Sequence, residues 1–392
     1  MIRKLADLAL RDKTVFVRVD FNVPIDQGRI TEPHRIDSAL PTIGFILERA
    51  KRLVLASHLG RPDGKPVAKY SLAPVREYLE RALNVPITLA PDCIGLKVER
   101  IVRDANQRVV LLENLRFHPE EEKNDRAFSQ ALAALADVYV NDAFGAAHRA
   151  HASISGMAAF FKEKAAGLLL QKELEYLTPI LTNPGKPFVT ILGGAKVSDK
   201  IGVIKNLLPR VDALLIGGGM AYTFLKAQGI DVGKSLLEQD KLGLATDILR
   251  EAAARGVRLL LPVDHVTGDS DKKNPTTSAG AVPAERLGLD IGPQTSSLFA
   301  DEIGKAKMVL WNGPVGLFEV PPYDQGSRAL AKALADRYPG VVSIIAGGDT
   351  VAAVTASGHE KRISHLSTGG GATLEFLEGK ELPGITALED GQ

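Results

Sequence analysis

The stretch Phe188-Val-Thr-Ile-Leu-Gly-Gly-Ala-Lys-Val-Ser-Asp-Lys200 carries the pattern on which the fold prediction depends. Its first five residues, mostly β-branched or aromatic, predict a short buried strand. Gly193 and Gly194 predict a tight turn, and Lys196 and Lys200 beyond it share one face of the expected helix. A strand, a glycine turn and a helix in this order are typical of the βαβ units that build parallel sheets.

The same alternation recurs along the whole chain. In the first half we expect strands at 14–19, 53–56, 109–112 and 138–140. In the second half we expect them at 188–192, 213–216, 258–261, 307–310 and 341–345. Because 392 residues exceed what one hydrophobic core usually organises, the length favours more than one domain. The sequence therefore predicts an α/β protein of two Rossmann-like lobes with parallel sheets.

A segment of helical character separates the two halves. Residues 165–181 are rich in Leu, Lys and Glu at helical spacing, and Asn183, Pro184 and Gly185 then signal a helix stop. We interpret this segment as a connecting helix and hinge. The expected division is an N-terminal lobe at 1–167, a connecting helix and hinge at 168–184, and a C-terminal lobe at 185–374. The polar stretch 267–283 predicts a surface loop.

The composition limits the class of protein. Lys and Arg total 48 against 47 Asp and Glu, so no overall field attracts nucleic acid or an anionic membrane. Cys93 is the only cysteine, which excludes an internal disulfide or a cysteine-based zinc site and favours a reducing compartment. Residues 1–11 lack the pattern of a signal peptide, and no apolar run is long enough to span a bilayer. We therefore expect a cytoplasmic protein without nucleic-acid or membrane partners.

Polar side chains follow the strands of the first half. Ligands in open α/β sheets bind at the carboxyl ends of the strands, so these positions are the candidate site. They are Asp20, Asn22, Ser57, His58, Arg61, Asn114, Arg116, Asn141, Asp142 and Arg149. One arginine at a strand end is usually solvated, but several together match the oxygens of a small, multiply anionic substrate.

Glycines follow the strands of the second half, together with one asparagine. They are Gly193, Gly194, Gly217, Gly218, Gly219, Asn312, Gly313, Gly347 and Gly348. A bare backbone can approach phosphates and the flat face of a base closely, so this half is the expected nucleotide side. A single glycine pair is often only a tight turn. Chance alone, however, would not place the polar strand ends in the first half of the chain and the glycine-rich strand ends in the second.

Three other patterns do not carry function in this interpretation. The segment 229–235 is one residue short of a P-loop and follows a helix-like stretch, so we expect a loop without phosphate-binding function. The glycines at 217–219 fail as a dinucleotide fingerprint because Tyr222 replaces the third glycine. His148 and His151 lie three apart without an evident third ligand, so a core or hydrogen-bonding role is expected.

Motifs in both halves resemble those of the phosphoglycerate kinase family, almost from end to end. In the first half they are Arg18-Val-Asp-Phe-Asn-Val-Pro24, Ser57-His-Leu-Gly-Arg-Pro62, Leu112-Glu-Asn-Leu-Arg-Phe117, Asn141-Asp-Ala-Phe-Gly145 and His148-Arg-Ala-His151. In the second half they are Gly193-Gly-Ala-Lys-Val-Ser-Asp-Lys200, Gly217-Gly-Gly-Met-Ala221, Trp311-Asn-Gly-Pro-Val-Gly316, Gly347-Gly-Asp-Thr350 and Ser367-Thr-Gly-Gly-Gly371. Their number and order make the resemblance specific.

The resemblance implies roles for individual residues. The positions that match 3-phosphoglycerate ligands are Asp20, Phe21, Asn22, Arg35, His58, Leu59, Gly60, Arg61, Arg116 and Arg149. Those that match nucleotide ligands are Gly194, Lys200, Gly218, Gly288, Asn312, Glu319, Gly347, Gly348, Asp349 and Thr350. Asp349 matches the magnesium-binding carboxylate, and Arg35, Lys196 and Lys200 are the expected catalytic residues. The resemblance also implies that the tail, 375–392, packs back on the first lobe.

One position departs from the family pattern. Ala346 precedes Gly347 and Gly348 where the family typically has a third glycine. A Cβ at a position that needs a positive φ costs about 1 kcal/mol or more, so alanine implies an ordinary backbone conformation there.

The reaction that the resemblance implies is reversible phosphoryl transfer between 1,3-bisphosphoglycerate and MgADP, giving 3-phosphoglycerate and MgATP, in glycolysis. In the reverse direction the nucleophile is a carboxylate that is already ionised at neutral pH, so no general base is needed. Catalysis then rests on positioning, on fixed cations and on closure of the lobes about the hinge. A monomer is expected.

Two alternatives stay open at this point. The first is another kinase that acts on a carboxylate, such as acetate or aspartate, which would need fewer arginines because its substrate has no phosphate of its own. The second is a non-catalytic nucleotide-binding or scaffolding protein that kept the fold. The combination of Lys196, Lys200, Arg35 and Asp349 argues against the second.

Overall fold

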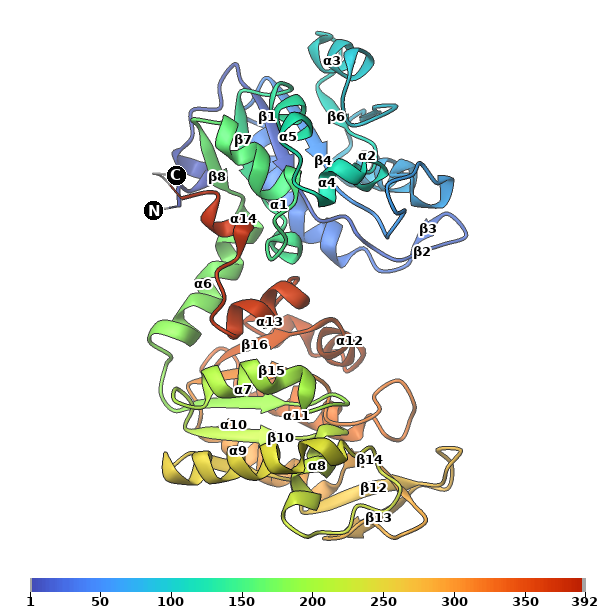
Figure 1. Ribbon diagram of the computed structural model, residues 1–392, viewed down its shortest axis with the longest axis vertical. Helices are drawn as coiled ribbons and strands as arrows, with labels where there is room; N and C mark the ends of the chain where they lie inside the picture. Colours follow the sequence, from blue (N-terminus) through green and yellow to red (C-terminus); the bar gives the residue numbers. More distant parts are fainter. Residues whose placement is uncertain (1, 390–392) are drawn as a thin grey trace. The chain divides into compact units, whose positions relative to one another are not determined.

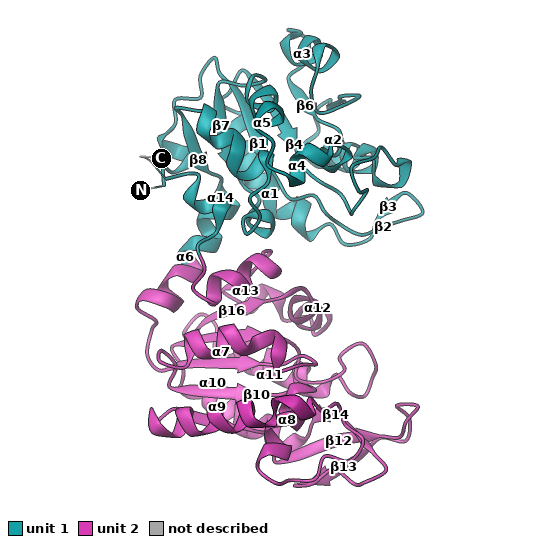
Figure 2. Cartoon of the chain, viewed as in Figure 1, with its two compact units in different colours: residues 1–175, 381–392 teal, residues 176–380 magenta. Residues whose placement is uncertain are grey.

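The chain folds into two compact units, each around its own sheet. The structure, a computed structural model, describes residues 2–389. The first unit comprises 1–175 and 381–392, and the second comprises 176–380 (Figure 2). Each unit contains a six-stranded sheet of parallel strands covered by helices (Figure 1), which confirms the predicted fold class. Within 2–389, no helix combines the length and apolarity that crossing a bilayer requires.

The sheet of the first unit has the strand order β5-β6-β4-β1-β7-β8. Its strands are β1 Thr14–Arg18, β4 Arg52–Ala56, β5 Thr88–Leu89, β6 Val109–Leu111, β7 Val138–Asn141 and β8 Lys164–Ala166. The helices are α1 His34–Leu47, α2 Ala73–Leu83, α3 Leu96–Arg103, α4 Pro119–Glu122 and α5 Arg126–Ala133, with a small hairpin of β2 Ile25–Asp26 and β3 Arg29–Ile30. All residues of β4 and β7 are buried, as expected for parallel strands with helices on both faces.

The sheet of the second unit has the order β11-β10-β9-β15-β16-β17. Its strands are β9 Phe188–Leu192, β10 Ala213–Ile216, β11 Arg258–Leu260, β15 Met308–Asn312, β16 Val342–Ala346 and β17 His365–Leu366. The helices are α7 Ile201–Leu207, α8 Met220–Ala227, α9 Leu242–Ala254, α10 Pro293–Lys305, α11 Gln325–Asp336, α12 Gly348–Ala356 and α13 Gly371–Leu377. Side chains of α10, α11 and α12 pack with those of the sheet in one core that surrounds Trp311.

A smaller antiparallel sheet in the second unit corrects the prediction of a surface loop at 267–283. Its strands are β12 Asp264–Gly268, β13 Thr276–Ala279 and β14 Leu287–Ile291, in the order β13-β12-β14. The prediction was wrong because β13 is an exposed edge strand of Thr, Ser and Ala without an apolar face. The β propensity of its threonines was outweighed by their polarity.

The connecting helix α6 spans Leu168–Thr182 and therefore begins three residues later than 165. The residues before it form edge strand β8, which pairs with β7. The division between the two units falls inside α6, between Glu175 and Tyr176.

Residues 381–389 return to the first unit, whereas 375–380 belong to the second. Helix α14 Pro383–Thr386 is anchored by its glycine: the Gly384 N–H donates to the carbonyl of Ala147 at 2.8 Å. Asn141 Nδ2 at the end of β7 donates to the carbonyl of Gly384 at 3.1 Å. The last residues of the predicted tail, 390–392, lie outside the described residues.

Candidate active site

The strand register of the first unit brings the predicted polar residues to one edge. Arg18 at the end of β1 lies opposite Ala56 of β4 on one side and Asn141 of β7 on the other. The residues that follow these strands, including Asp20 and His58, therefore start from neighbouring strand ends.

Asp20, Asn22 and Arg35 form one hydrogen-bonded group. The Asn22 N–H donates to Asp20 Oδ1 at 3.1 Å, and Arg35 Nη1 donates to the Asn22 carbonyl at 3.0 Å. Arg35 also forms an ion pair with Asp20 at 3.4 Å and stays half-buried in the first turn of α1. The Gly60 N–H donates to Asn22 Oδ1 at 2.8 Å, which ties the loop after β4 to the same group. Three segments are thus held together, two through side chains and the third through the backbone of Gly60.

Arg18 is a member of this site that the sequence interpretation did not single out. Its side chain is fully buried, its Nε donates to Ser153 Oγ at 2.8 Å, and its Nη2 lies 3.2 Å from His58 Nδ1. Ser153 in turn donates to the buried carboxylate of Glu121, from Oγ at 2.5 Å and from its N–H at 2.9 Å. The sequence pattern places Arg18 within the predicted strand 14–19, although a charge at the end of an apolar strand is a usable signal of a site.

Several guanidinium groups act on the same two histidines. Burial, followed by the charges of Arg18 and Arg116, lowers the pKa of His58 well below its usual value. Burial, followed by Arg116, Arg18 and Arg149, lowers the pKa of His151 to about 3. Both imidazoles are therefore neutral at neutral pH, first because they are buried and second because the arginine charges surround them. We refer to Arg18, Arg116, Arg149 and these two histidines at this edge of the sheet as the cationic pocket.

The remaining predicted substrate residues differ in exposure. Arg116 is 5% exposed, its Nη1 donates to the Gly60 carbonyl at 2.8 Å, and burial lowers its pKa. Phe21 and Leu59 are buried, so they support the pocket through packing. Arg149 is half-buried, and Arg61 is exposed.

Three glycine turns of the second unit pack against one another. The Gly193 N–H donates to the Asn312 carbonyl at 3.0 Å, and the Gly194 N–H donates to that of Pro314 at 3.0 Å. A Cβ on Gly193 would lie 2.1 Å from the Pro314 oxygen, and one on Gly218 would lie 2.7 Å from the Gly194 nitrogen. Only glycine permits these approaches. The surface formed here is therefore backbone, as the sequence predicts.

Lys200 and Asn312 connect these turns to the loop after β16. Lys200 Nζ donates to Asn312 Oδ1, and Asn312 Nδ2 donates to the Ala346 carbonyl at 2.9 Å. Thr350 Oγ1 accepts from the Gly313 N–H at 2.7 Å and is fully buried. Burial lowers the pKa of Lys200, while the carboxylates of Asp199 and Asp349 act in the opposite direction.

The first turn of α12 is suited to bind an anion and a cation together. Gly347 has a φ of 90°, and no side chain caps the helix that begins at Gly348. The N–H groups of this turn are therefore available to phosphate oxygens. Asp349 is exposed in the same turn, and its carboxylate is the kind of hard oxygen ligand that Mg²⁺ prefers. In proteins Mg²⁺ usually binds through one or two carboxylates and the phosphates of the substrate. Ala346 is the last residue of β16 and has no positive φ, which confirms the expectation of an ordinary backbone there.

Glu238 positions the segment that carries Lys196 and Lys200. It accepts hydrogen bonds from the Val197 N–H at 2.6 Å, the Ser198 N–H at 3.1 Å and Ser198 Oγ at 2.6 Å. Burial alone would raise the pKa of Glu238, but these hydrogen bonds together lower it. Sequence reasoning missed Glu238 because its partners lie about forty residues earlier in the chain. Lys196 itself is exposed.

Two further predicted nucleotide ligands lie outside these turns. Gly288 is in β14, and its N–H donates to Ser235 Oγ at 2.9 Å. Glu319 is exposed in the loop after β15.

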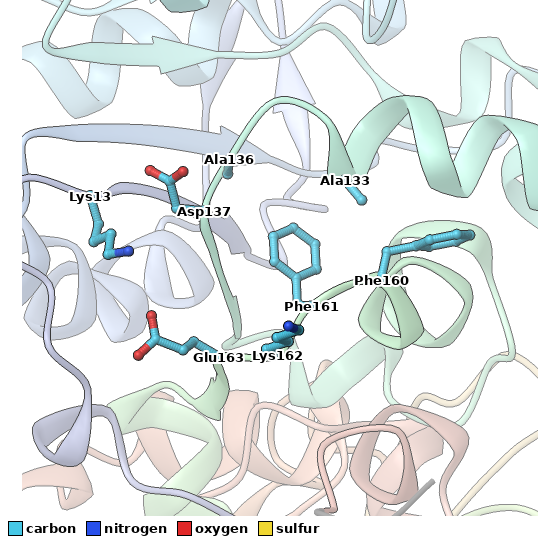
Figure 3. Close-up of a pocket in the computed structure, with 8 residues that line it drawn as sticks. All are labelled: Lys13, Ala133, Ala136, Asp137, Phe160, Phe161, Lys162 and Glu163. Atoms are coloured by element: carbon cyan, nitrogen blue, oxygen red, sulfur yellow. The ribbon is translucent and has the colours of Figure 1, made fainter.

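A groove in the first unit lies at the opposite edge of the sheet from the cationic pocket. Figure 3 shows its lining residues: Lys13, Ala133, Ala136, Asp137, Phe160, Phe161, Lys162 and Glu163. Lys13, Asp137 and Glu163 immediately precede β1, β7 and β8, so the groove belongs to the amino ends of the strands. It is not the candidate active site.

A cationic pocket on one parallel sheet, and glycine turns with an open helix N-terminus on another, define a phosphotransferase of two α/β units. Comparison with known proteins specifies the family. Residues 5–380 match the sequence profile of the family described as phosphoglycerate kinase. The chain belongs to the phosphoglycerate kinase family and is a kinase.

Individual relatives agree over the full length. The chain is 55% identical to a phosphoglycerate kinase of Koribacter versatilis, with 98% of both chains covered. It is 50% identical to one of Chlorobaculum tepidum, with 99% of both covered. The solved phosphoglycerate kinase from Coxiella burnetii superposes with a TM-score of 0.89 at 43% identity, covering 99% of both chains. That from Pyrococcus horikoshii superposes with a TM-score of 0.85 at 31% identity, covering 99% of this chain and 98% of that one.

The role of Glu238 leads to a first prediction. In Glu238→Ala the N–H groups of residues 197 and 198 lose a charged acceptor, so their hydrogen exchange should accelerate by about tenfold or more. The measurement is amide hydrogen exchange of the full chain by mass spectrometry. Asp240→Ala, which removes an exposed carboxylate from the same region, is the control and should leave that exchange unchanged. Equal protection in both variants would show that Glu238 does not hold the segment.

Proposed function

We propose that the chain catalyses reversible phosphoryl transfer from 1,3-bisphosphoglycerate to MgADP, giving 3-phosphoglycerate and MgATP, as a step of glycolysis. The proposal includes a monomer in the cytoplasm. The observation that supports it is that the two units present different groups at their strand ends. Buried guanidinium groups lie together in the first unit, and glycine turns lie together in the second.

The substrate side of the proposal uses the first unit, 1–167 by the expected bounds. A substrate with a phosphate and a carboxyl group at opposite ends needs several fixed cations and a few neutral donors. The proposed ligands are Asp20, Phe21, Asn22, Arg35, His58, Leu59, Gly60, Arg61, Arg116 and Arg149. Because burial and the arginine charges keep His58 neutral, it would bind as a hydrogen-bonding group without adding a charge.

The nucleotide side uses the second unit, 185–374 by the expected bounds. Gly194, Gly218 and Gly288 would border the base, and Glu319 would reach the ribose hydroxyls. Gly347 to Thr350 would bind the phosphates through the first turn of α12. Asp349 would hold the magnesium ion, which neutralises phosphate charge when it is bound with the nucleotide.

Catalysis in this proposal needs fixed cations and no general base. The attacking carboxylate of 3-phosphoglycerate is ionised at neutral pH, and the phosphoryl group in transfer spreads negative charge over its equatorial oxygens. Arg35, Lys196 and Lys200 are the proposed catalytic residues. Asp20 and Asn312 already orient Arg35 and Lys200, so little reorganisation is required during transfer.

Transfer also requires that the two half-sites meet. Each unit carries the ligands of only one reactant, so we propose that the units close about the connecting helix and hinge, 168–184. Closure excludes water, which would otherwise hydrolyse the acyl phosphate.

A steady-state assay decides between this function and its alternatives. With MgATP, the chain should phosphorylate 3-phosphoglycerate, and it should show no turnover with acetate or aspartate because neither supplies a phosphate for the arginines. Formation of ADP is followed by a coupled enzyme reaction. Turnover of acetate or aspartate alone would replace the proposal by the other carboxylate kinases, and no turnover with any acceptor would favour a binding protein.

Lys196→Met should lower kcat by roughly a hundredfold or more, since it removes a cation expected to act on the transferring group. Nucleotide binding should stay measurable by isothermal titration calorimetry. The matched control is Lys205→Met, which removes an exposed lysine from the nearby helix α7. An unchanged kcat in Lys196→Met would exclude this lysine from the mechanism.

Arg35→Ala should lower kcat/KM by roughly a hundredfold, through both a lower kcat and a higher KM for 3-phosphoglycerate. The reason is that Arg35 is expected to contact the substrate before and during transfer. Arg29→Ala, which removes an exposed arginine of the neighbouring β3, is the control. A rise in KM with kcat unchanged would limit Arg35 to ground-state binding.

A further inference from the structure

Asp92, Cys93 and His118 form a cluster of potential metal ligands that the proposed reaction does not use. One ligand atom from each residue lies within 4.8 Å of the others. Within residues 2–389, this is the single group of three or more His, Cys, Asp or Glu residues that meets this criterion. It belongs entirely to the first unit.

The topology of the sheet places these residues together. Asp92 and Cys93 lie in the loop between β5 and α3, and His118 is the residue before α4 in the segment after β6. Because β5 and β6 pair in parallel, their carboxyl ends lie side by side. The two loops are joined further by the Cys93 thiol, which donates to the Glu113 carbonyl at 3.0 Å.

The three side chains span the range from core to surface. Cys93 is fully buried, whereas the side chain of Asp92 is 51% exposed and that of His118 is 24% exposed. His118 Nε2 lies 2.6 Å from Asp92 Oδ1, which is a direct hydrogen-bond contact, so a bound ion would replace this contact. Because Asp92 and His118 are both partly exposed, an ion would approach from their side and would require a local movement to reach the buried sulfur.

Two neighbouring residues lie against the His118 ring. His118 Nδ1, the ring nitrogen away from Asp92, lies 3.9 Å from Glu120 Oε2, which is beyond hydrogen-bond distance. A carboxylate that pairs with the far nitrogen of a ligating imidazole fixes its tautomer, and Glu120 would have to move closer to do so. Phe128 packs on the same ring, with 5.1 Å between the ring centres, and limits its rotation.

We propose that Asp92, Cys93 and His118 bind a divalent transition metal of the zinc class, with water as the fourth ligand. One thiolate, one imidazole and one carboxylate suit Zn²⁺ or Co²⁺ in tetrahedral geometry. Mg²⁺ is excluded from this set because it prefers octahedral sites of oxygen ligands. The site is therefore chemically distinct from the one proposed at Asp349.

The charges and protons balance when the metal ion binds. The Cys93 thiol gives up its proton to solvent as the sulfur–metal bond forms, and its hydrogen bond to the Glu113 carbonyl is lost. His118 binds the ion through the lone pair of Nε2, so the proton that Nε2 shares with Asp92 moves to Nδ1 and the contact with Asp92 opens. One thiolate and one carboxylate then compensate the two positive charges of the ion. One proton is released for each ion bound.

This inference departs from an expectation of the sequence analysis. A single cysteine predicts no cysteine-based zinc site, because structural sites of that kind use two or more thiolates. A mixed set with one thiolate needs only Cys93. Its members lie 25 residues apart in the chain, and neither spacing nor motif brings His118 to Cys93 without the sheet.

The test uses cobalt as a spectroscopic probe of the full chain, freed of any affinity tag and treated with a chelator. Co²⁺ should bind with a stoichiometry of one to one and produce a thiolate-to-cobalt charge-transfer band with tetrahedral d–d bands. Zn²⁺ should abolish these bands, and millimolar Mg²⁺ should not. Since the chain contains one cysteine, any thiolate band reports Cys93.

Variants separate this site from others. Cys93→Ser should lose the charge-transfer band, and His118→Gln and Asp92→Asn should each weaken Co²⁺ binding by about tenfold or more. Asp92 is exposed, so its variant tests the site even if a change at buried Cys93 impairs folding. Asp349→Asn should keep the full cobalt spectrum whether or not the proposed kinase reaction is correct. Absence of a thiolate band in the wild type, or equal Co²⁺ affinity in the wild type and Asp92→Asn, would leave Cys93 a buried neutral thiol and overturn the proposal.

Discussion

Parallel pairing of the strands is the constraint on which both candidate half-sites depend. Parallel neighbours require a return connection, and every strand therefore ends at the same edge of its sheet. In the first unit the register sets Arg18 of β1 between Ala56 of β4 and Asn141 of β7. In the second it sets Leu192 between Ile216 and Asn312. Residues distant in the chain meet because their strands end together.

The cationic pocket shows how the fold holds like charges close to one another. Burying a guanidinium group costs several kcal/mol unless it is paired and hydrogen-bonded. Arg18 is buried with Ser153 as its partner, and the buried carboxylate of Glu121 lies behind Ser153. Burial raises the pKa of Glu121, and the positive charge of Arg18 opposes that rise. A second carboxylate, that of Glu122, forms an ion pair with Arg116 at 3.0 Å. Two carboxylates do not neutralise the three guanidinium groups of Arg18, Arg116 and Arg149, so positive potential remains for an anionic ligand.

The sequence predicts those parts of the molecule that repeat a strong local pattern. The apolar runs of β1, β4, β9 and β10 are buried on both faces, and their ends could be located to within a residue or two. Strand β13 has no such pattern, because its exposed threonines obtain their partners only from β12. The same limit applies to the sites. Glycines at strand ends are visible in the sequence, whereas Glu121 reaches Ser153, and Glu238 reaches Ser198, only through tertiary packing.

The two half-sites use different physical means, and under the proposed function this difference follows from their ligands. A substrate phosphate that arrives without a metal has its charge uncompensated, so side-chain cations such as Arg116 must supply the balance. A nucleotide arrives with magnesium, which already offsets much of its charge. Backbone N–H groups at the start of α12 are then sufficient, since they provide dipoles at fixed positions without further net charge. The turns at Gly193 and Gly218 contribute a surface without side chains. Binding both anionic reactants on one unit would require more buried cations beside those that already help to lower the pKa of His58 and His151. The energetic cost of crowding buried cations favours a site that is divided between two sheets. Under the proposed function, closure of the two units is then a required step of the reaction.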